Sequence, residues 1–575
     1  MSSNNKSLLL TLGHNSSAIL VEDGKIICGY EEERLSKVKS DSAFPRLAIM
    51  ECLNYKYCDK LDIVYISYWN DSFDIFEKTA TFADKHYDRK FLNTLCKHYG
   101  CTIKYLSPSF THHDAHAYAA LNFFENHATE AEQKEDFHVI VADGFGNREE
   151  VVTIYKRNAA DSTLERIDKV WDYFSSVGLM YQYATGFCGM KMNEDEYKFL
   201  GYESHIKEVL DDAAIAKLYD YSDKFVAEYI QQAERRTLGD SFGSYIDVSK
   251  LAAVQEWWNN EFNMFLGIMD FKKEEHDIEK VRCVIAAFIQ NNIEQFIGHF
   301  LKKHNVKNVI LSGGIFYNVK LNNFIMNHIP GKICVYPLAG DQGAALGFYR
   351  KYHGKFELKS LFFGKRDLHM DANTAEYVKK NLKNFEYYED RQKMIDRIVE
   401  LVSADKIVNI MTDDMEFGPR ALGSTTTMAL PTRKNVSYIN QLNLRNDVMP
   451  MAPQILKSKA YKYFGSQVDR IIGSNFYMII TMDQLHTPDE SYIGISHKYP
   501  LKDVYSSRCQ LIDDDSTQYV RYVLNALNSD FVTNTSNNAH GRPILMTLFD
   551  AIRNHEFTAK NDTENRSYSI IGAFC

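Results

Sequence analysis

The beginning of the chain alternates short apolar runs with turn residues. Residues 8–12 are leucines apart from Thr11, and residues 18–21 are apolar. Glu22-Asp23-Gly24 separates the second run from a third at residues 26–30. An Asp-Gly pair between two apolar runs is a strong signal for a β-hairpin. The spacing of apolar positions then becomes helix-like at residues 46–57. The chain is therefore predicted to open with paired strands followed by a helix.

In the middle of the chain, predicted strands end at glycine-rich or acidic turns. One strand runs into Asp143-Gly144, a second into Ser312-Gly313-Gly314, and a third into Gly340-Asp341-Gln342-Gly343. Residues 205–305, between the first and the second of these strands, have a mostly helical pattern. Ligands of α/β folds bind at the carboxyl ends of strands, so these turns are candidate site elements.

The length of 575 residues exceeds what one hydrophobic core usually serves. We predict a first domain at residues 1–350, with an internal pseudo-repeat as one option, a Lys-rich irregular linker at 351–371, and a second α/β domain at 372–575. In the second domain a helix is predicted at 374–403, before a strand at 407–411.

Composition describes an ordinary globular protein, with 45% apolar and 25% charged residues. A net charge of -10 argues against a strong general polyanion-binding surface, although a local basic groove remains compatible with it. The ten cysteines contain no CxxC pair, which favours a reduced, intracellular protein. No apolar stretch reaches membrane-spanning length, and the first apolar run is too short for a signal peptide. We expect a cytoplasmic protein with no membrane partner.

His112 and His116 are the most informative pair of side chains. On a helix their spacing of four residues places both imidazoles on one face, close enough to hold one metal ion. Asp143 and Asp341 each follow a predicted strand and precede or lie among glycines. The alternatives are a polar helix face for the histidines and plain turn chemistry for the aspartates. Together the four residues would form a site that suits Fe(II), Mn(II) or Zn(II).

Other polar motifs suit the binding of anions. Ser312-Gly313-Gly314, followed by Asn318, is a candidate nucleotide loop, although a tight strand-helix turn has the same composition. His14, after the first strand, is a candidate for binding phosphate or substrate. The charge run Glu31-Glu32-Glu33-Arg34 is interpreted as the solvated start of a helix.

In the second domain, Gly418-Pro419 is a rigid turn that would present Arg420 to a phosphate or carboxylate. Arg445, Arg508 and the polar run 533–538 would complete an anion pocket. The alternative is that scattered arginines lie on the surface.

With these motifs in this order, the sequence resembles the O-carbamoyltransferases of the NodU/CmcH type, which include the tobramycin carbamoyltransferase. The resemblance covers nearly the whole chain. It rests on the following segments: Gly13-His14 with Ser16-Ser17-Ala18, Glu31-Glu32-Glu33-Arg34, residues 112–120, Asp143-Gly144, Asn193-Glu194-Asp195-Glu196-Tyr197-Lys198, Ser312-Gly313-Gly314, Gly340-Asp341-Gln342-Gly343-Ala344, residues 416–423 and Asn534-Thr535-Ser536.

The resemblance implies a Kae1-like N-terminal domain of the actin/hexokinase-like ATPase class and a YrdC-like α/β C-terminal domain. In the family, the C-terminal domain joins ATP, with Mg, and carbamoyl phosphate to give carbamoyl-adenylate and pyrophosphate. The N-terminal domain then transfers the carbamoyl group to a substrate hydroxyl with the help of a metal, often Fe(II).

Family roles carry over to this chain by motif. The metal ligands would be His112, His116, Asp143 and Asp341. Adenylate would contact Gly313, Gly314 and Asn318. The residues at the reacting groups would be His14, Lys198 and Arg420. The remaining contacts to ATP and carbamoyl phosphate would come from Arg445, Arg508, Asn534 and Ser536.

The chain also departs from the family pattern. Thr425 and Asn443 stand where relatives have basic residues, and Arg542 stands where they have Glu before proline. Two basic side chains are thereby lost from the expected phosphate pocket, and Arg542 is the candidate to replace one of them.

These departures, with a Lys-, Asn- and Tyr-rich, Pro-poor composition, resemble the bacteriophage branch of the family. The acceptor expected there is 5-hydroxymethylcytosine, as nucleotide or in DNA, in the host cytoplasm. The aromatic pairs Trp257-Trp258 and Phe316-Tyr317 are candidates to stack on a base, although core packing is their commoner role.

Alternative functions remain open at this point. One is O-carbamoylation of a sugar or an antibiotic-like natural product. A second is formation of threonylcarbamoyl groups for tRNA, and a third is a non-catalytic nucleotide-binding module. A homodimer is one arrangement to expect, because such enzymes often dimerise.

Overall fold

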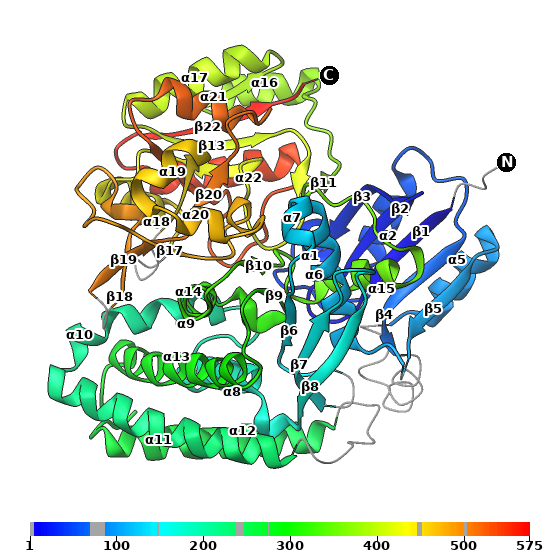
Figure 1. Cartoon of the computed structure of the whole chain (residues 1–575). Coiled ribbons are helices and arrows are strands. Elements are labelled where there is room, and N and C mark those ends of the chain that lie inside the picture. The colour runs from blue at the N-terminus through cyan, green and yellow to red at the C-terminus, as the bar shows by residue number, and fades with distance from the viewer. Residues whose placement is uncertain are drawn as a thin grey trace.

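The structure is a computed structural model that describes residues 5–69, 87–107, 109–146, 149–236, 247–273, 275–445, 451–499 and 503–574. Its N-terminal half contains two five-stranded sheets, and its C-terminal half is built on one seven-stranded sheet (Figure 1). Helices cover the sheets, as in other α/β proteins.

The two N-terminal sheets share one topology. Their orders are β3-β2-β1-β4-β5 and, read in reverse, β8-β7-β6-β9-β10. In each, three consecutive strands form an antiparallel meander, whose first strand also pairs in parallel with a later strand. The strands are β1 (Lys6–Thr11), β2 (Ser17–Glu22), β3 (Lys25–Glu31), β4 (Ile63–Trp69), β5 (Thr102–Leu106), β6 (His138–Ala142), β7 (Glu150–Arg157), β8 (Leu164–Trp171), β9 (Val309–Ser312) and β10 (Ile333–Val335). This duplication confirms the actin/hexokinase-type class and the internal repeat.

The strand interiors follow from their sequence. Leu8, Leu9 and Leu10 of β1, and Ile310 and Leu311 of β9, are fully buried. Strands that pair in parallel are covered by helices on both faces, so continuous apolar runs replace alternation.

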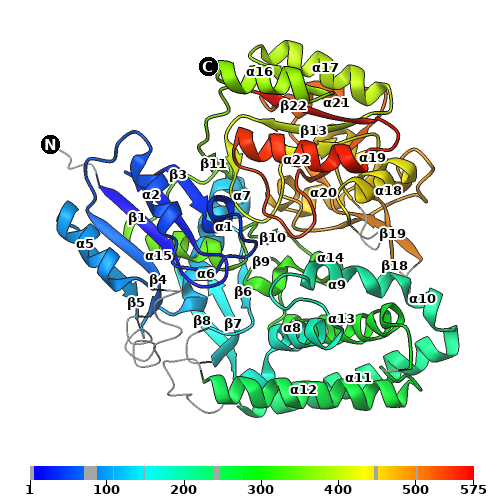
Figure 2. The same ribbon diagram turned by 180° about the vertical axis from the view of Figure 1, so that it is seen from behind.

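A helical insertion lies between β8 and β9, which confirms the helical pattern of residues 205–305. Figures 1 and 2 show it as a separate layer away from the first sheet. Its main helices are α8 (Val177–Phe187), α9 (Glu196–Tyr202), α11 (Asp212–Arg236), α12 (Val248–Ile268) and α13 (Ile278–Lys303). Trp258 is fully buried in the core between these helices.

Two equivalent helices of the repeat cross in backbone contact. α6 (His112–His127) follows β5 of the first sheet, and α15 (Ala344–His353) follows β10 of the second. A Cβ built on Gly347 would lie 1.8 Å from the Ala115 carbonyl oxygen and 2.6 Å from the Ala119 nitrogen. Only glycine allows the helices to approach this closely.

The C-terminal sheet has the order β12-β22-β13-β15-β21-β16-β20 and contains both parallel and antiparallel pairs. Its strands are β12 (Phe385–Tyr388), β13 (Ile407–Thr412), β15 (Thr425–Met428), β16 (Ala452–Leu456), β20 (Gln510–Ile512), β21 (Phe531–Ser536) and β22 (Ser567–Gly572). The α/β class expected of this half is confirmed, and its likeness to YrdC stays a prediction.

The single helix predicted at 374–403 is wrong. The structure has α16 (Ala372–Asn381), then β12, then α17 (Arg391–Ser403). The strand lies at a sheet edge and pairs in parallel with β22, and Asp390 caps the next helix. Strand pairing in the folded chain outweighs the local helical spacing here.

The predicted linker also carries structure. Within residues 351–371, β11 (Phe362–Gly364) pairs with β14 (Met415–Glu416). Arg366 donates to the carbonyl oxygens of Thr412 and Asp413 and to the Thr425 hydroxyl. The domain limits themselves stay a prediction.

The two halves meet along α14 (Val319–His328) and β10. Arg470 of the C-terminal half donates to the carbonyl oxygens of Met326, Ile329 and Gly331 at 2.6–3.0 Å. Across the same interface, the Asn322 amide donates to the Ile479 carbonyl at 2.7 Å.

Among the described helices, none is long and apolar enough to cross a membrane.

The crossing of α6 and α15 gives a stability prediction. Gly347→Ala should lower the free energy of unfolding by about 1–3 kcal/mol, because the methyl group forces the helices apart. The midpoint of thermal unfolding would report this loss. Gly267→Ala in α12, where a Cβ meets nothing within 4 Å, is the control and should leave the midpoint unchanged or raise it. Equal midpoints for both variants would contradict the close contact.

Candidate functional site

Four side chains from three parts of the N-terminal half converge on one point. His112 and His116 come from the start of α6, Asp143 follows β6, and Asp341 follows β10. One ligand atom from each lies within 4.8 Å of the others. The Nε2 atoms of the histidines are 3.0 Å apart, and each lies 3.3–3.4 Å from an oxygen of Asp143 and of Asp341. Two imidazoles and two carboxylates in this arrangement could hold a divalent metal ion.

The charges of this cluster are strongly coupled. Burial alone would lower the pKa of His112, yet the Asp341 and Asp143 carboxylates outweigh it and raise that pKa to about 10. Burial would raise the pKa of Asp341, but His112 holds it well below its usual range. The carboxylates are therefore ionised and need a nearby cation, which a metal or a protonated histidine supplies.

The start of α6 is built to hold the histidines in place. Thr111 and Asp114 form a capping box, in which each side chain accepts from the other residue's backbone N–H. Arg166 and the Tyr155 hydroxyl both donate to the Asp114 carboxylate, at 2.8 and 2.9 Å. A helix end fixed in this way orients its first turn, where His112 lies.

The glycines of the Ser312 motif close the loop over the end of β6. Gly313 has a φ of +100°, and a Cβ there would lie 2.2 Å from the Ala142 carbonyl oxygen. A Cβ on Gly314 would lie 2.9 Å from an oxygen of Asp143. The Ser312 hydroxyl is 3.4 Å from Nδ1 of His116, on the side of the ring away from the cluster. The motif thus shapes the candidate metal cluster and leaves Gly313 outside the cavity wall.

A second group of site residues comes from the C-terminal half. Arg420, Arg445 and Arg508 all face one cavity. Burial lowers the pKa of each guanidinium, and Arg420 lowers that of Arg508 further. Among the described residues, Arg445 donates to neutral groups, including the Thr535 hydroxyl at 2.6 Å. Among the residues that the structure describes, none of the three has a carboxylate within ion-pair distance.

The cavity has a volume of about 980 Å³ and joins the two groups. His112, Asp143 and Asp341 of the N-terminal half and the three arginines of the C-terminal half all line it. His116 lies behind His112 and is fully buried. One cavity is therefore lined by an acidic cluster suited to a cation and by arginines suited to an anion.

Two family models match the two halves of the chain that supply the residues of this cavity. The family model "Carbamoyltransferase N-terminus" matches residues 67–348, and "Carbamoyltransferase C-terminus" matches residues 399–563. The chain belongs to the carbamoyltransferase family.

Named relatives cover the chain at low identity. It is 27% identical to the "Uncharacterized protein MJ1051" of Methanocaldococcus jannaschii, over 94% of both chains. It is 23% identical to the "Nodulation protein NolNO" of Sinorhizobium fredii, over 96% of this chain and 78% of that protein. Among solved structures, T. kodakarensis HypF overlaps 61% of this chain and 47% of its own with 12% identity, at a TM-score of 0.30, too low for a conclusion.

The predicted reacting residues lie in the wall of the carbamoyltransferase cavity. His14 is half exposed, and its Nδ1 lies 3.9 Å from Asp341. Lys198 contacts the Asp195 carboxylate and lies 3.2 Å from Nε2 of His540. The sequence interpretation missed His540, which lies between the polar run 533–538 and Gly541. Its place in that glycine-bounded polar segment was the available signal.

Three of the predicted binding residues have structural contacts of their own. Asn318 caps α14 and donates to the Gln290 amide oxygen at 2.8 Å. Asn534 is buried and donates to the Ala421 carbonyl at 2.9 Å, next to Arg420. Ser536 accepts from Arg445 at 3.2 Å. In this carbamoyltransferase, Asn534 and Ser536 thus support the arginines.

The three departures from the family pattern lie in different surroundings. Thr425 and Asn443 are buried and outside the cavity wall, and Thr425 contacts Glu416 and Arg366. Arg542 lines the cavity, as expected of a replacement charge.

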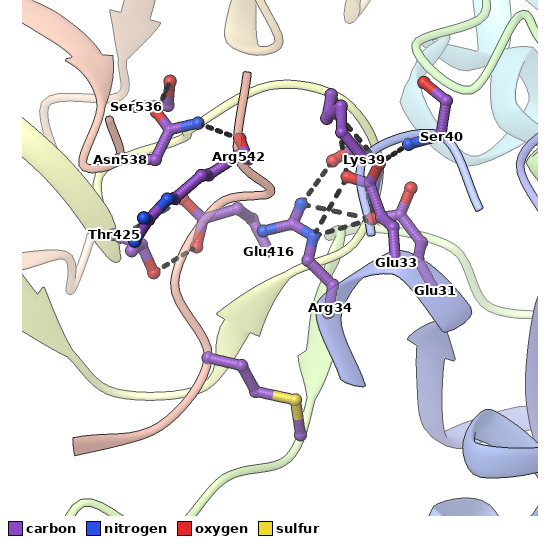
Figure 3. A network of polar contacts seen from close by, with 12 residues as sticks. Glu31, Glu33, Arg34, Lys39, Ser40, Glu416, Thr425, Ser536, Asn538 and Arg542 are labelled. Atoms are coloured by element: carbon purple, nitrogen blue, oxygen red, sulfur yellow. Dashed lines mark hydrogen bonds and ion pairs between the residues drawn. The ribbon is translucent and has the colours of Figure 1, made fainter. Parts of the chain in front are cut away.

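The interpretation of residues 31–34 as a solvated helix start is wrong. Arg34 is fully buried, and the three glutamates are at most 8% exposed. Figure 3 shows Glu31, Glu33 and Arg34 in a network that faces the C-terminal half. Contacts between segments far apart in sequence bury this charge run.

Of the aromatic pairs, Trp258 and Phe316 are core residues, as their commoner role suggested, and Tyr317 lines the cavity.

Metal analysis tests the candidate metal cluster. His112→Ala should lower the affinity for a divalent metal about 10–100-fold, because loss of a direct ligand should cost at least as much as loss of a residue that hydrogen-bonds to a ligand. Elemental mass spectrometry of the purified protein would show the lower metal content. His127→Ala, in the last turn of the same helix, is the control and should retain the metal. Equal metal content in both variants would exclude this cluster as the site.

Proposed function

We propose that this carbamoyltransferase uses ATP and carbamoyl phosphate to form carbamoyl-adenylate and transfers the carbamoyl group to an acceptor hydroxyl. The observation that carries the proposal is the shared cavity. It is lined by three half-buried arginines that lack carboxylate partners among the described residues, and by His112, Asp143 and Asp341 of the candidate metal cluster.

The basic wall suits the anionic reactants. Buried guanidinium groups bind phosphate oxygens through short, charge-assisted hydrogen bonds. Arg420, Arg445 and Arg508 would hold the phosphate of carbamoyl phosphate and the phosphates of ATP. One water would hydrolyse carbamoyl phosphate to phosphate and carbamate. The carbamate oxygen would then attack the α-phosphorus of ATP and displace pyrophosphate, which leaves the carbamoyl carbon joined through oxygen to AMP, the leaving group of the next step.

The acidic side suits the transfer step. His112, His116, Asp143 and Asp341 would hold a divalent ion, with Fe(II), Mn(II) or Zn(II) all compatible with the donors, and such an ion supplies charge stabilisation as a Lewis acid. His14 lies at the edge of this cluster with an exposed ring. It would accept the proton of the acceptor hydroxyl as the oxygen attacks the carbamoyl carbon and AMP leaves.

A single cavity also protects the intermediate. Carbamoyl-adenylate reacts with water, so transfer within one cavity lined by both halves would shorten its exposure to hydrolysis. Lys198 and His540 line the same cavity and would contact the intermediate. Gly314 and Asn318 border the same space and are the proposed adenylate contacts.

The acceptor that we propose first is 5-hydroxymethylcytosine, as nucleotide or in DNA. A sugar or an aminoglycoside hydroxyl is the alternative. Tyr317, in the cavity wall, is an aromatic surface on which a base could stack.

Mass spectrometry tests the reaction and the acceptor together. Purified protein with ATP, carbamoyl phosphate, Mg(II) and Fe(II) should release pyrophosphate and add one carbamoyl group to an acceptor. The acceptor panel contains 5-hydroxymethylcytosine as nucleotide, in single strands and in duplex DNA, with an aminoglycoside and a simple sugar. Pyrophosphate without carbamoylated product would reject this panel but retain adenylation. Neither product would contradict the proposed function.

A substitution tests the anion wall. Arg508→Ala should raise the KM for carbamoyl phosphate or ATP about 10–100-fold, the loss expected for one or two hydrogen bonds to a charged group. Arg553→Ala, on the exposed face of α22 (Leu548–Asn561), is the control and should leave both KM values unchanged. Unchanged kinetics in Arg508→Ala would remove this arginine from the site.

A further inference from the structure

We infer that Glu31 and Arg34 are positioning residues for Arg420: they hold the backbone of its loop from across the interface between the two halves. The inference rests on the proposed function, because it assigns Arg420 to the binding of an anionic reactant. It makes the anion pocket of the C-terminal half dependent on a buried ion pair of the N-terminal half.

Glu31 and Arg34 hydrogen-bond to both backbone polar groups of Gly418. Arg34 donates through Nη2 to the Gly418 carbonyl oxygen at 2.7 Å, and the Gly418 N–H donates to Oε2 of Glu31 at 3.1 Å. The same Glu31 oxygen accepts from Nε of Arg34 at 3.1 Å. Gly418 lies two residues before Arg420, so the grip fixes the loop directly beside the guanidinium.

The loop has little freedom to adopt another path. Gly418 has a φ of +105°, which favours glycine, and a Cβ there would lie 2.5 Å from a methyl group of Leu338. Leu338 belongs to the segment between β10 and Asp341, so the loop rests on the same segment that supplies a candidate metal ligand. Displacing Gly418 would move both walls of the cavity relative to each other.

The far end of the loop is fastened from within the C-terminal half. The fully buried Glu416 carboxylate accepts from the backbone N–H groups of Leu422 and Thr425, at 3.0 and 3.2 Å. Arg420 thus lies between an internal anchor and the external anchor at Gly418. Its own Nε is buried without a hydrogen-bond partner among the described residues, so the backbone has to aim the side chain.

The pair is itself held from the rim of the cavity. Both oxygens of Glu33 accept from Lys39 at 2.9 Å, and Oε2 also accepts from the Ser40 N–H at 2.8 Å. Oε1 of Glu33 lies 3.9 Å from Nε of Arg34. Figure 3 shows Glu31, Glu33, Arg34 and Lys39 on one side of the interface and Glu416 and Thr425 on the other. Lys39 and Ser40 line the cavity, so the network runs from its rim to the Arg420 loop.

The test replaces the arginine with a side chain that keeps the charge but loses the planar fork. Arg34→Lys should raise the KM for carbamoyl phosphate, or for ATP if Arg420 binds that reactant, about tenfold or more with a smaller change in kcat. Glu31→Gln keeps an acceptor oxygen and should have a weaker effect on the same KM. Both variants should retain the wild-type metal content, because neither residue touches the metal cluster.

Arg470→Lys is the matched control. Arg470 also donates to backbone carbonyls across the interface, at 2.6–3.0 Å, but lies outside the cavity wall. The Arg470→Lys variant should have a lower thermal midpoint, because it too loses the planar guanidinium group at the interface. Both of its KM values should stay within about twofold of wild type, because this interface contact lies away from the cavity.

The outcomes separate this inference from the proposed function. Wild-type turnover with unchanged KM values in both Arg34→Lys and Glu31→Gln would overturn the positioning role alone. An equal rise of KM in Arg470→Lys would also overturn the positioning role, because any damage to the interface would then be enough to raise KM. A wild-type protein that neither consumes carbamoyl phosphate nor binds it by calorimetry would overturn the proposed function and this inference with it.

Discussion

The backbone contact between α6 and α15 is the constraint on which the rest of the structure depends. Gly347 brings α15 against the carbonyl of Ala115, between the two histidines of α6. This contact joins the two repeats, because each helix follows the last strand of its own sheet. It therefore sets the distance between the His112 side of the site and the loop that carries Asp341. A larger residue at this crossing would separate ligands that lie 225 or more positions apart in sequence.

The cavity is lined by side chains of opposite charge, the carboxylates of Asp143 and Asp341 and the guanidinium groups of the three arginines. Ionised carboxylates and buried guanidinium groups are both costly to remove from water, and each cost is offset only by a partner of opposite charge. The acidic cluster has His112 as its partner when no metal is bound. Arg445 donates to neutral groups, and none of the three arginines has a carboxylate within ion-pair distance among the described residues. Under the proposed function, an anionic reactant would supply this compensation and stabilise the wall that binds it.

The sequence predicted the parts of the site that depend on local pattern. The spacing of His112 and His116 placed them on one helix face, and glycine-flanked Asp143 and Asp341 were expected at strand ends. The sequence could not show which residues far apart in the chain lie close together in the folded protein. Glu31 and Arg34 bond to Gly418, which lies 387 residues after Glu31, while Glu32 and Glu33 are bonded by residues of the N-terminal half. No local signal separates such a buried charge run from a solvated one. The break of the 374–403 helix has the same origin, because β12 forms only where β22 is available to pair with it.

The network at residues 31–34 also changes how the two halves should be regarded. A C-terminal half that bound its anions alone would need only internal supports such as Glu416 and Asn534. Instead, the loop of Arg420 is completed by a charged pair that belongs to the other half. Burying that pair without Gly418 would leave a carboxylate oxygen and a guanidinium nitrogen with fewer partners, which is unfavourable. Docking of the halves therefore satisfies the buried pair and orders the anion pocket in one step, so the reactive intermediate would be formed only where the transfer site is already in place.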